Sequence, residues 1–170
     1  MHQTTMPVTY GYGSSADLTA LKQLSLAAYG KLTPQLTPEN QEIWHEGLND
    51  EDKLMALIGL SQAHIARCGD QIVGMAFLVP NGNPTPVYDA GWAYLRMVAV
   101  HPAYQGRGIA AQLTQNCINS ARNNGETIIA LHTSEMMPAA RHLYEKAGFA
   151  IRRELDPIFG KRYWLYTLAL

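Results

Sequence analysis

The stretch MVAVHPAYQGRGIAAQL, residues 97–113, joins an expected strand to an expected helix through a glycine-rich turn. The first backbone N–H groups of a helix have no partner within it, and the helix dipole attracts an anion to that end. Gly106 and Gly108 carry no Cβ, so the turn can bend tightly and let phosphate oxygens approach the backbone. Arg107 adds a positive charge. The stretch therefore predicts a phosphate-binding turn.

Two common phosphate motifs fit this turn poorly. A P-loop requires a lysine after its last glycine, and none follows Gly108. Gly106-x-Gly108-x-x-Ala111 formally satisfies the dinucleotide fingerprint, but that motif follows its strand almost directly and needs an acid near the end of the next strand. Here five residues separate Val100 from Gly106, and Glu126 precedes the next strand. A nicotinamide or flavin site is therefore disfavoured.

The periodicity of apolar residues predicts a mixed α/β domain around one sheet. The expected order is strand, helices, three strands, helix, strand, helix and two strands. Ser15 or Asp17 is expected to cap the first helix. The strands are expected at 7–11, 64–68, 71–79, 92–100, 127–132, 150–155 and 162–168, and the helices from 15 or 17 to 29, then at 39–48, 50–60, 109–123 and 138–147. Residues 1–170 show no repeat or linker, which predicts a single domain.

Composition narrows the classes of function. The chain has 170 residues, 47% hydrophobic, with a formal charge of -1, which argues against a general nucleic-acid binder. Residues 1–10 lack the pattern of a signal peptide, and the longest apolar stretches, 54–60 and 75–79, are too short to span a bilayer. We therefore expect a cytoplasmic protein without a membrane partner.

Cys68 and Cys117 form no C-x-x-C pair and the histidines show no ligand spacing, so no metal site is expected.

Strict alternation along residues 92–100 predicts one dry and one mixed face for this strand. The dry face, which is entirely apolar, would carry Ala93, Leu95, Met97 and Ala99. The mixed face, which has both apolar and polar residues, would carry Trp92, Tyr94, Arg96, Val98 and Val100. A strand of this kind often borders a cleft, so Tyr94 and Arg96 are candidates for a ligand site.

Two motifs together resemble one family. Gln105-x-x-Gly108-x-Ala110, with the lead-in Val-Ala-Val-His-Pro at 98–102, resembles the Gln/Arg-x-x-Gly-x-Gly/Ala signature of the GCN5-related N-acetyltransferases. Leu143-Tyr-Glu-Lys-Ala-Gly-Phe149 resembles the same family's Leu-Tyr-x-x-x-Gly-Phe element. The close match covers roughly residues 95–149. The resemblance implies a twisted, mostly antiparallel sheet of about seven strands, flanked by helices and splayed between the fourth and fifth strands.

The same resemblance implies acetyl-CoA as co-substrate. The strand at Val98, Ala99 and Val100 would hydrogen-bond to the pantetheine arm, and the acetyl thioester would lie in the gap beside the strand at 127–132. The pyrophosphate would lie against the turn and helix start, where the expected contacts are Gln105, Gly106, Arg107, Gly108, Ile109, Ala110 and Ala111.

Tyr144 occupies the position where the family often has its general acid. A phenol has a pKa near 10, so it keeps its proton at neutral pH and can donate it to a departing thiolate. Two positions differ from the family. Met137 replaces a common Asn that contacts the cofactor, and Tyr94 stands where some members have a Glu base. The base is therefore open among Glu135, His132, Glu46 and a water chain.

The acceptor is less closely defined. An acidic helical region at 39–52 suggests a cationic amine or polyamine, whereas Arg96 suggests an amino acid or peptide terminus whose carboxylate it would pair with. Tyr94, Arg96 and His132 are the candidate substrate contacts. The expected function is acetyl transfer to a primary amine, most simply of a small molecule. The alternatives are a protein or peptide N-acetyltransferase and an acyl-CoA-binding sensor without turnover. Many relatives form homodimers, but no segment here reveals an interface.

Overall fold

The computed structural model describes residues 6–170, in which seven strands form one sheet. The first five residues of the N-terminal stretch considered for a signal peptide lie outside this range. The spatial order of the strands is β1-β2-β3-β4-β5-β7-β6. Their bounds are Val8–Tyr12, Gln62–Cys68, Gln71–Val79, Ala93–Val100, Ile128–Ser134, Ala150–Glu154 and Tyr163–Ala169, for β1 to β7 in chain order. The predicted mixed α/β fold and strand number are confirmed.

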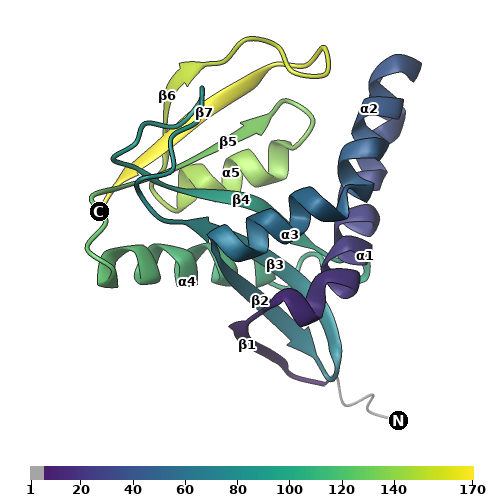
Figure 1. The fold of residues 1–170 in the computed structure, drawn as a ribbon, viewed down its shortest axis with the longest axis horizontal. Helices are drawn as coiled ribbons and strands as arrows, with labels where there is room; N and C mark the ends of the chain where they lie inside the picture. Colours follow the sequence, from purple (N-terminus) through teal and green to yellow (C-terminus); the bar gives the residue numbers. More distant parts are fainter. Residues whose placement is uncertain (1–5) are drawn as a thin grey trace.

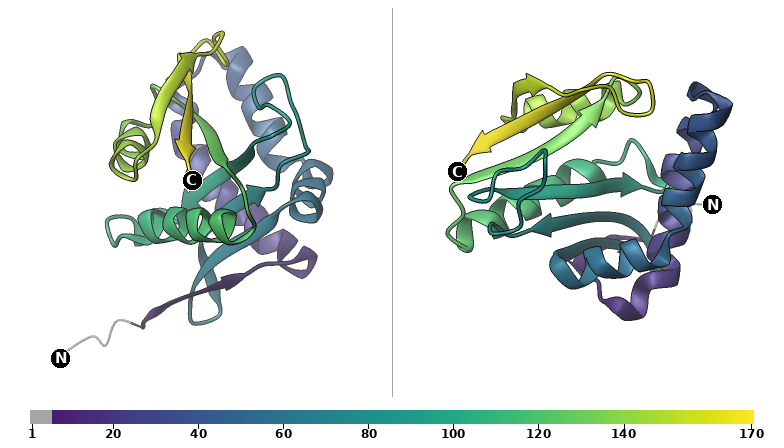
Figure 2. Two further views of the ribbon diagram at one scale, coloured as in Figure 1. Left: turned by 90° about the vertical axis from the view of Figure 1, so that its left-hand side faces the viewer. Right: turned by 45° about the horizontal axis from the view of Figure 1, so that its top comes forward.

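Helices cover both faces of this sheet (Figure 1). The helices α1 to α5 span Leu18–Tyr29, Pro38–Asn49, Glu51–Leu60, Ile109–Asn123 and Pro138–Lys146. Figure 2 shows α4 and α5 on one side of the sheet and the N-terminal helices on the other. Within the described residues, no helix combines the length and the apolar character needed to cross a membrane.

Local sequence explains where the N-terminal helices begin. Thr37 and Asp50 cap α2 and α3 with their side chains, accepting from the amides of Asn40 and Lys53. Asp17, one of the two predicted caps, is the N-cap residue of α1, but its side chain makes no capping hydrogen bond to that helix. Ser14 caps a short 3₁₀ turn in which the Asp17 carboxylate accepts from the Ser14 amide, a reciprocal arrangement that leads directly into α1.

The gap between β4 and β5 follows from their limited pairing. Every neighbouring pair of strands is antiparallel except β4 and β5, which are parallel and register only at Ala93↔Ile129 and Tyr94↔Ala130. Beyond Tyr94 the two strands separate, so the predicted splay is confirmed. The edge of β4 that faces β5 is left without a strand partner from Leu95 onward.

A bulge in β4 overturns the predicted alternation of its faces. Between Phe77↔Arg96 and Met75↔Ala99, β3 advances two residues and β4 advances three. The extra residue, Met97, has a φ of 52°. A bulge of this kind reverses the side-chain pattern beyond it. Val98 and Val100 therefore join Ala93 and Leu95 in the cluster under α4, whereas Met97 and Ala99 pack with α1 on the opposite face.

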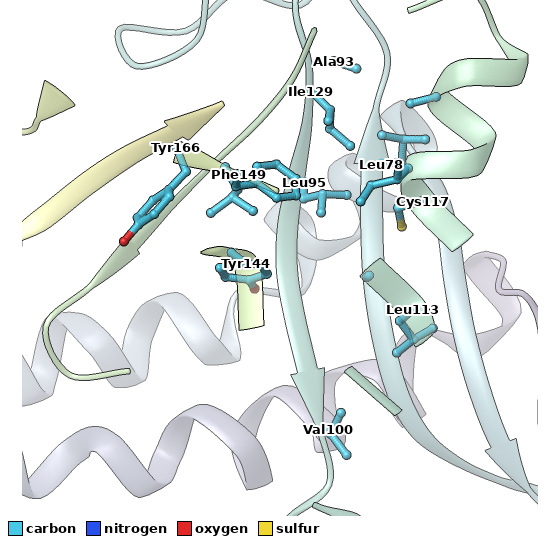
Figure 3. Packing of buried hydrophobic residues seen from close by; sticks show 14 of the residues in the cluster. Leu78, Ala93, Leu95, Val100, Leu113, Cys117, Ile129, Tyr144, Phe149 and Tyr166 are labelled. Atoms are coloured by element: carbon cyan, nitrogen blue, oxygen red, sulfur yellow. The ribbon is translucent and has the colours of Figure 1, made fainter. Parts of the chain in front are cut away.

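The main core lies between the sheet and α4 and α5 (Figure 3). The helix α4 approaches β3 closely at Gly74, where an added Cβ would lie 2.9 Å from both Ile109 and Leu113. Cys117 is fully buried in this core, and burial raises the pKa of its thiol to about 12. Tyr144 belongs to the same cluster, so α5 is anchored by the residue expected to carry chemistry.

Candidate active site

A cavity of about 680 Å³ lies between the start of α4, the free edge of β4 and α5. We call it the α4 cavity. Its wall contains ten of the residues selected from the two sequence motifs, namely Val98, Ala99, Val100, Gln105, Gly106, Gly108, Ile109, Ala110, Ala111 and Tyr144. Arg107 lies outside this wall, with its guanidinium 5.0 Å from the centre of the Tyr104 ring. The structure therefore gathers two motifs about 35 residues apart around one cavity.

The turn into α4 presents backbone donors to this cavity. Gly106 and Gly108 both have a φ of 77°, in the left-handed region that residues with a Cβ rarely adopt. No side chain caps α4, and its first backbone hydrogen bond runs from the Gln112 amide to the Gly108 carbonyl at 3.0 Å. Within residues 6–170, the amides of 106–111 have no backbone acceptor. Unpaired amides at the positive end of a helix dipole can bind a phosphate group.

The free edge of β4 continues the cavity away from this turn. Val98, Ala99 and Val100 line it where β5 has turned away. The Val98 carbonyl accepts a hydrogen bond of 2.9 Å from the Tyr29 hydroxyl at the end of α1. An extended ligand that carries amides can pair with such an exposed strand edge, as an added strand would.

Tyr144 reaches the cavity from α5. Its side chain is 6% exposed, and its ring packs edge-to-face against Phe149 at 6.0 Å between centroids. Among the described residues its hydroxyl has no hydrogen-bond partner. Burial raises the pKa of this phenol above its usual value, and the nearby Tyr29, Tyr88 and Cys117 raise it further. The group is therefore protonated at neutral pH and free to donate.

A second cavity, of about 530 Å³, lies on the other side of Tyr29 and Met137, which line both cavities. We call it the Arg96 cavity. Its wall comes from α1, α2, α3, β4, β5, the start of β7 and the segments before α5 and β7. Most of its side chains are apolar, including Ile43, Trp44, Leu48, Leu54, Leu57, Ile158 and Phe159. Ser25, Asp50, Lys53, Arg96 and His132 add polar groups.

Arg96 and His132, both selected from the sequence, line the Arg96 cavity. Arg96 is half-buried, and none of the ion pairs within residues 6–170 includes it. His132 shares a hydrogen bond of 2.5 Å between its Nδ1 and the Tyr88 hydroxyl. Burial, with a smaller contribution from the Arg96 charge, lowers the pKa of His132 to about 4. His132 is therefore neutral at physiological pH, and Arg96 is an uncompensated cation beside it.

The remaining candidates lie away from this wall. The ring of Tyr94 stacks on Tyr88 with 4.1 Å between centroids, and its hydroxyl donates to the Asn83 carbonyl. Tyr94 thus packs in the core beside the Arg96 cavity without lining it. Glu46 and Glu135, considered as bases, are exposed and line neither cavity. The acids of α2 likewise point elsewhere, because this helix contributes Ile43, Trp44, Gly47 and Leu48 to the wall.

Sequence reasoning missed several residues of the α4 cavity. Tyr29 and Lys31, at the end of α1 and just after it, also line the cavity. Lys31 brings a positive charge that would complement a phosphorylated ligand. Met137, by contrast, was noted from the sequence as the replacement for a common Asn, and it precedes Pro138 at the start of α5 and lines both cavities. No sequence motif links residues 29–31 to the turn, which lies more than 70 positions away.

Comparisons with known proteins agree with this geometry. The family model described as Acetyltransferase (GNAT) family matches residues 21–149. N-alpha-acetyltransferase 30 from Schizosaccharomyces pombe is 37% identical over 78 residues, 43% of this chain and 52% of that protein. L-amino acid N-acyltransferase MnaT from Escherichia coli is 30% identical over 71 residues, 40% of each chain. The match thus spans about half the length, or less, of these two curated relatives.

The fold is also similar to that of solved structures. The paia N-acetyltransferase from Thermoplasma acidophilum, solved in complex with coenzyme A, has a TM-score of 0.74 and 17% sequence identity, with 94% of this chain and 98% of that chain covered. The family model covers most of the chain, and the turn, the splayed strands and the Tyr144 element lie within the matched range. The chain therefore belongs to the GNAT family of acetyltransferases.

Proposed function

We propose that this protein transfers an acetyl group from acetyl-CoA to the primary amine of a small molecule. The observation that carries the proposal is the α4 cavity, which joins unpaired amides at 106–111, an open strand edge at 98–100 and a protonated Tyr144. A phosphate-bearing group at one end, an amide-bearing arm in the middle and a thioester at the other end match these three features in order. The Thermoplasma protein with a similar fold was solved with coenzyme A.

The residues of the two cavities would divide the chemistry. Acetyl-CoA supplies a thioester whose carbonyl carbon an amine attacks, with release of the sulfur as a thiolate. Tyr144 would donate its phenolic proton to that sulfur and regain a proton from the cationic nitrogen or from water. The amides of 106–111 and Lys31 would hold the phosphates, and the β4 edge would orient the arm.

The proton lost by the amine is best assigned to water. A histidine with a pKa of about 4 is a weak base at neutral pH, and Nδ1 of His132 is already engaged by Tyr88. The carboxylates of Glu46 and Glu135 lie outside both cavities. We therefore propose that the amine enters as the free base and that His132 shapes the acceptor side.

Free thiol release from acetyl-CoA, measured with a broad panel of amines beside calorimetry of CoA binding, tests the proposal. Turnover of at least one small amine, with its N-acetyl product identified by mass, is the expected result. CoA binding without turnover of any amine would favour the sensor alternative instead. Acetylation restricted to peptide N-termini would favour a protein or peptide N-acetyltransferase, the alternative that the name of the Schizosaccharomyces relative supports.

A further inference from the structure

We propose that the acceptor is a free α-amino acid with a large apolar side chain, held by its carboxylate on Arg96. This inference rests on the proposed acetyl transfer and specifies its acceptor. It follows from three properties of the Arg96 cavity, which are an unpaired cation, an unpaired hydroxyl and an apolar remainder.

The first property is the charge of Arg96. The guanidinium lies in the wall of the cavity without a carboxylate partner among residues 6–170. Its charge acts on Tyr29, Tyr88 and His132, where it opposes or adds to the effect of burial on their pKa values. A half-buried arginine surrounded by neutral aromatic groups gains most from a ligand carboxylate, which it can hold with two hydrogen bonds.

The second property is an unpaired hydroxyl on α1. Ser25 lines the cavity, is 1% exposed, and its Oγ has no hydrogen-bond partner in the described part of the chain. A buried hydroxyl without a partner is unfavourable unless a ligand supplies one. An acceptor carboxylate held by Arg96 would offer oxygens to this second donor.

The third property is the balance of the remaining wall. The α2 residues that line the cavity are Ile43, Trp44, Gly47 and Leu48, and Ile43 is 55% exposed. Asp50 and Lys53 also lie in the wall. An oxygen of Asp50 caps α3 by accepting from the Lys53 amide at 3.0 Å, and the Lys53 ammonium, which is in none of the ion pairs of residues 6–170, adds a second cation. This surface suits an apolar side chain better than a polyamine, which needs several free acids.

The position of Arg96 selects an α-amino acid. It lies on β4 two residues before Val98, and the open edge of β4 begins beside it. Tyr29 and Met137 mark where the two cavities meet. A carboxylate on Arg96 and an amine near that junction must therefore be close together in the acceptor. A peptide N-terminus has no carboxylate at this distance, because its first carboxyl group is part of an amide.

Three acceptors that differ in one group test the proposal: phenylalanine, phenylalaninamide and phenethylamine, with spermidine as the cationic alternative. We expect kcat/KM for phenylalanine to exceed that for the amide and for phenethylamine by roughly ten- to hundredfold. Arg96→Gln should remove this preference by lowering the phenylalanine value alone. Arg153→Gln, an exposed arginine on β6, is the control and should leave the preference unchanged. Equal use of all three acceptors, or a wild-type preference for spermidine, would overturn the proposal.

Ser25→Ala separates ligand binding from folding. Because the hydroxyl is unpaired, its removal should leave the protein as stable as before while raising the KM for phenylalanine roughly threefold to tenfold. Thr133→Val removes another unpaired buried hydroxyl that lines neither cavity, so its KM should not change. A loss of stability in Ser25→Ala, with unchanged KM, would assign this hydroxyl to the fold.

Calorimetry in the presence of CoA distinguishes failure of this inference from failure of the proposed function. Phenylalanine that binds the wild type, binds Arg96→Gln at least tenfold more weakly and is never acetylated would support the carboxylate site and contradict the transferase. Acetylation of amines with no preference for a carboxylate would support the transferase and contradict the carboxylate site. If phenylalanine is neither bound nor acetylated, the inference is overturned directly.

Discussion

The α4 cavity and the Arg96 cavity meet at Tyr29 and Met137 but are built from different groups. The α4 cavity offers backbone amides and a strand edge, held in place by two glycines of positive φ. The Arg96 cavity offers side chains from six helices and strands and the loops between them, with Arg96 and Lys53 as cations outside every ion pair of residues 6–170. Backbone groups can bind any ligand of the right phosphate and amide spacing, whereas side chains discriminate between ligands by charge and shape.

The two cavities should respond differently to substitution. A donor site that depends on backbone conformation tolerates many changes of side chain but few changes of glycine. An acceptor site that depends on side chains can change its substrate by single substitutions, with the donor site intact. Substitutions in the two cavities should therefore produce different kinetic signatures, and those at their junction should affect turnover alone.

The largest effect is expected at Tyr144, on the α4 cavity side of the junction. Tyr144→Phe should lower kcat by roughly a hundredfold or more, because the thiolate then leaves without an acid, while CoA affinity changes less than about twofold. The matched control is Tyr104→Phe, which removes a phenol from the same cavity. Steady-state kinetics and calorimetry measure both. Unchanged kcat in Tyr144→Phe would remove this residue from the mechanism.

A next, smaller effect is expected from the backbone of the donor turn. Gly108→Val should weaken CoA binding by roughly ten- to a hundredfold, since a β-branched residue resists a φ of 77° and its side chain would occupy the phosphate position. Gly125→Val strains the other end of α4, where φ is 79°, and should leave CoA affinity unchanged. Calorimetric titration with CoA compares the two. Equal loss in both variants would show that strain, not the turn, limits binding.

The packing of α4 against β3 at Gly74 should affect CoA binding less, and the free energy of unfolding more, than the donor turn does. Gly74→Ala would place a Cβ 2.9 Å from Ile109 and Leu113, which should cost about 1–3 kcal/mol of unfolding free energy and weaken CoA binding severalfold by moving the helix start. Gly59→Ala in α3 has open space and should stabilise the protein by about 1 kcal/mol. Urea denaturation provides the free energies. A Gly74→Ala protein of wild-type stability would contradict this packing.

The last prediction concerns pH and the Arg96 cavity, where stability rather than binding or turnover should change. The pKa of His132 is about 4 when folded and near 6.5 when unfolded, so acidification between these values favours the unfolded chain, which binds the proton. This histidine should therefore cost the wild type about 2 kcal/mol of unfolding free energy between pH 7 and pH 5. His132→Gln should lack that contribution. Denaturation curves of both proteins at pH 7 and pH 5 measure the difference. An equal loss of unfolding free energy in the wild type and in His132→Gln would contradict the assignment.

The same contrast explains what the sequence could predict. The stretch at 98–111 and the element at 143–149 are local patterns, and the family resemblance that they carry implied the fold, the splay and ten residues that line one cavity. The reversal of side chains after Met97 was missed, because a bulge depends on how β3 and β4 pair and leaves no periodic signal. Tyr94 was selected on the same alternation, but its partner Tyr88 comes from an irregular loop. Ser25, Ile43 and Phe159 were missed since tertiary packing alone brings them to Arg96.

A crystal structure with acetonyl-CoA, a thioether analogue that cannot transfer its acyl group, would show whether the α4 cavity holds the donor with its carbonyl at Tyr144. We expect the diphosphate against the amides of 106–111, the pantetheine arm along 98–100, and the analogue's carbonyl beside the Tyr144 hydroxyl, facing the Arg96 cavity. A diphosphate bound away from the start of α4, or a carbonyl directed away from Tyr144 and the junction, would show that the α4 cavity is not the donor site.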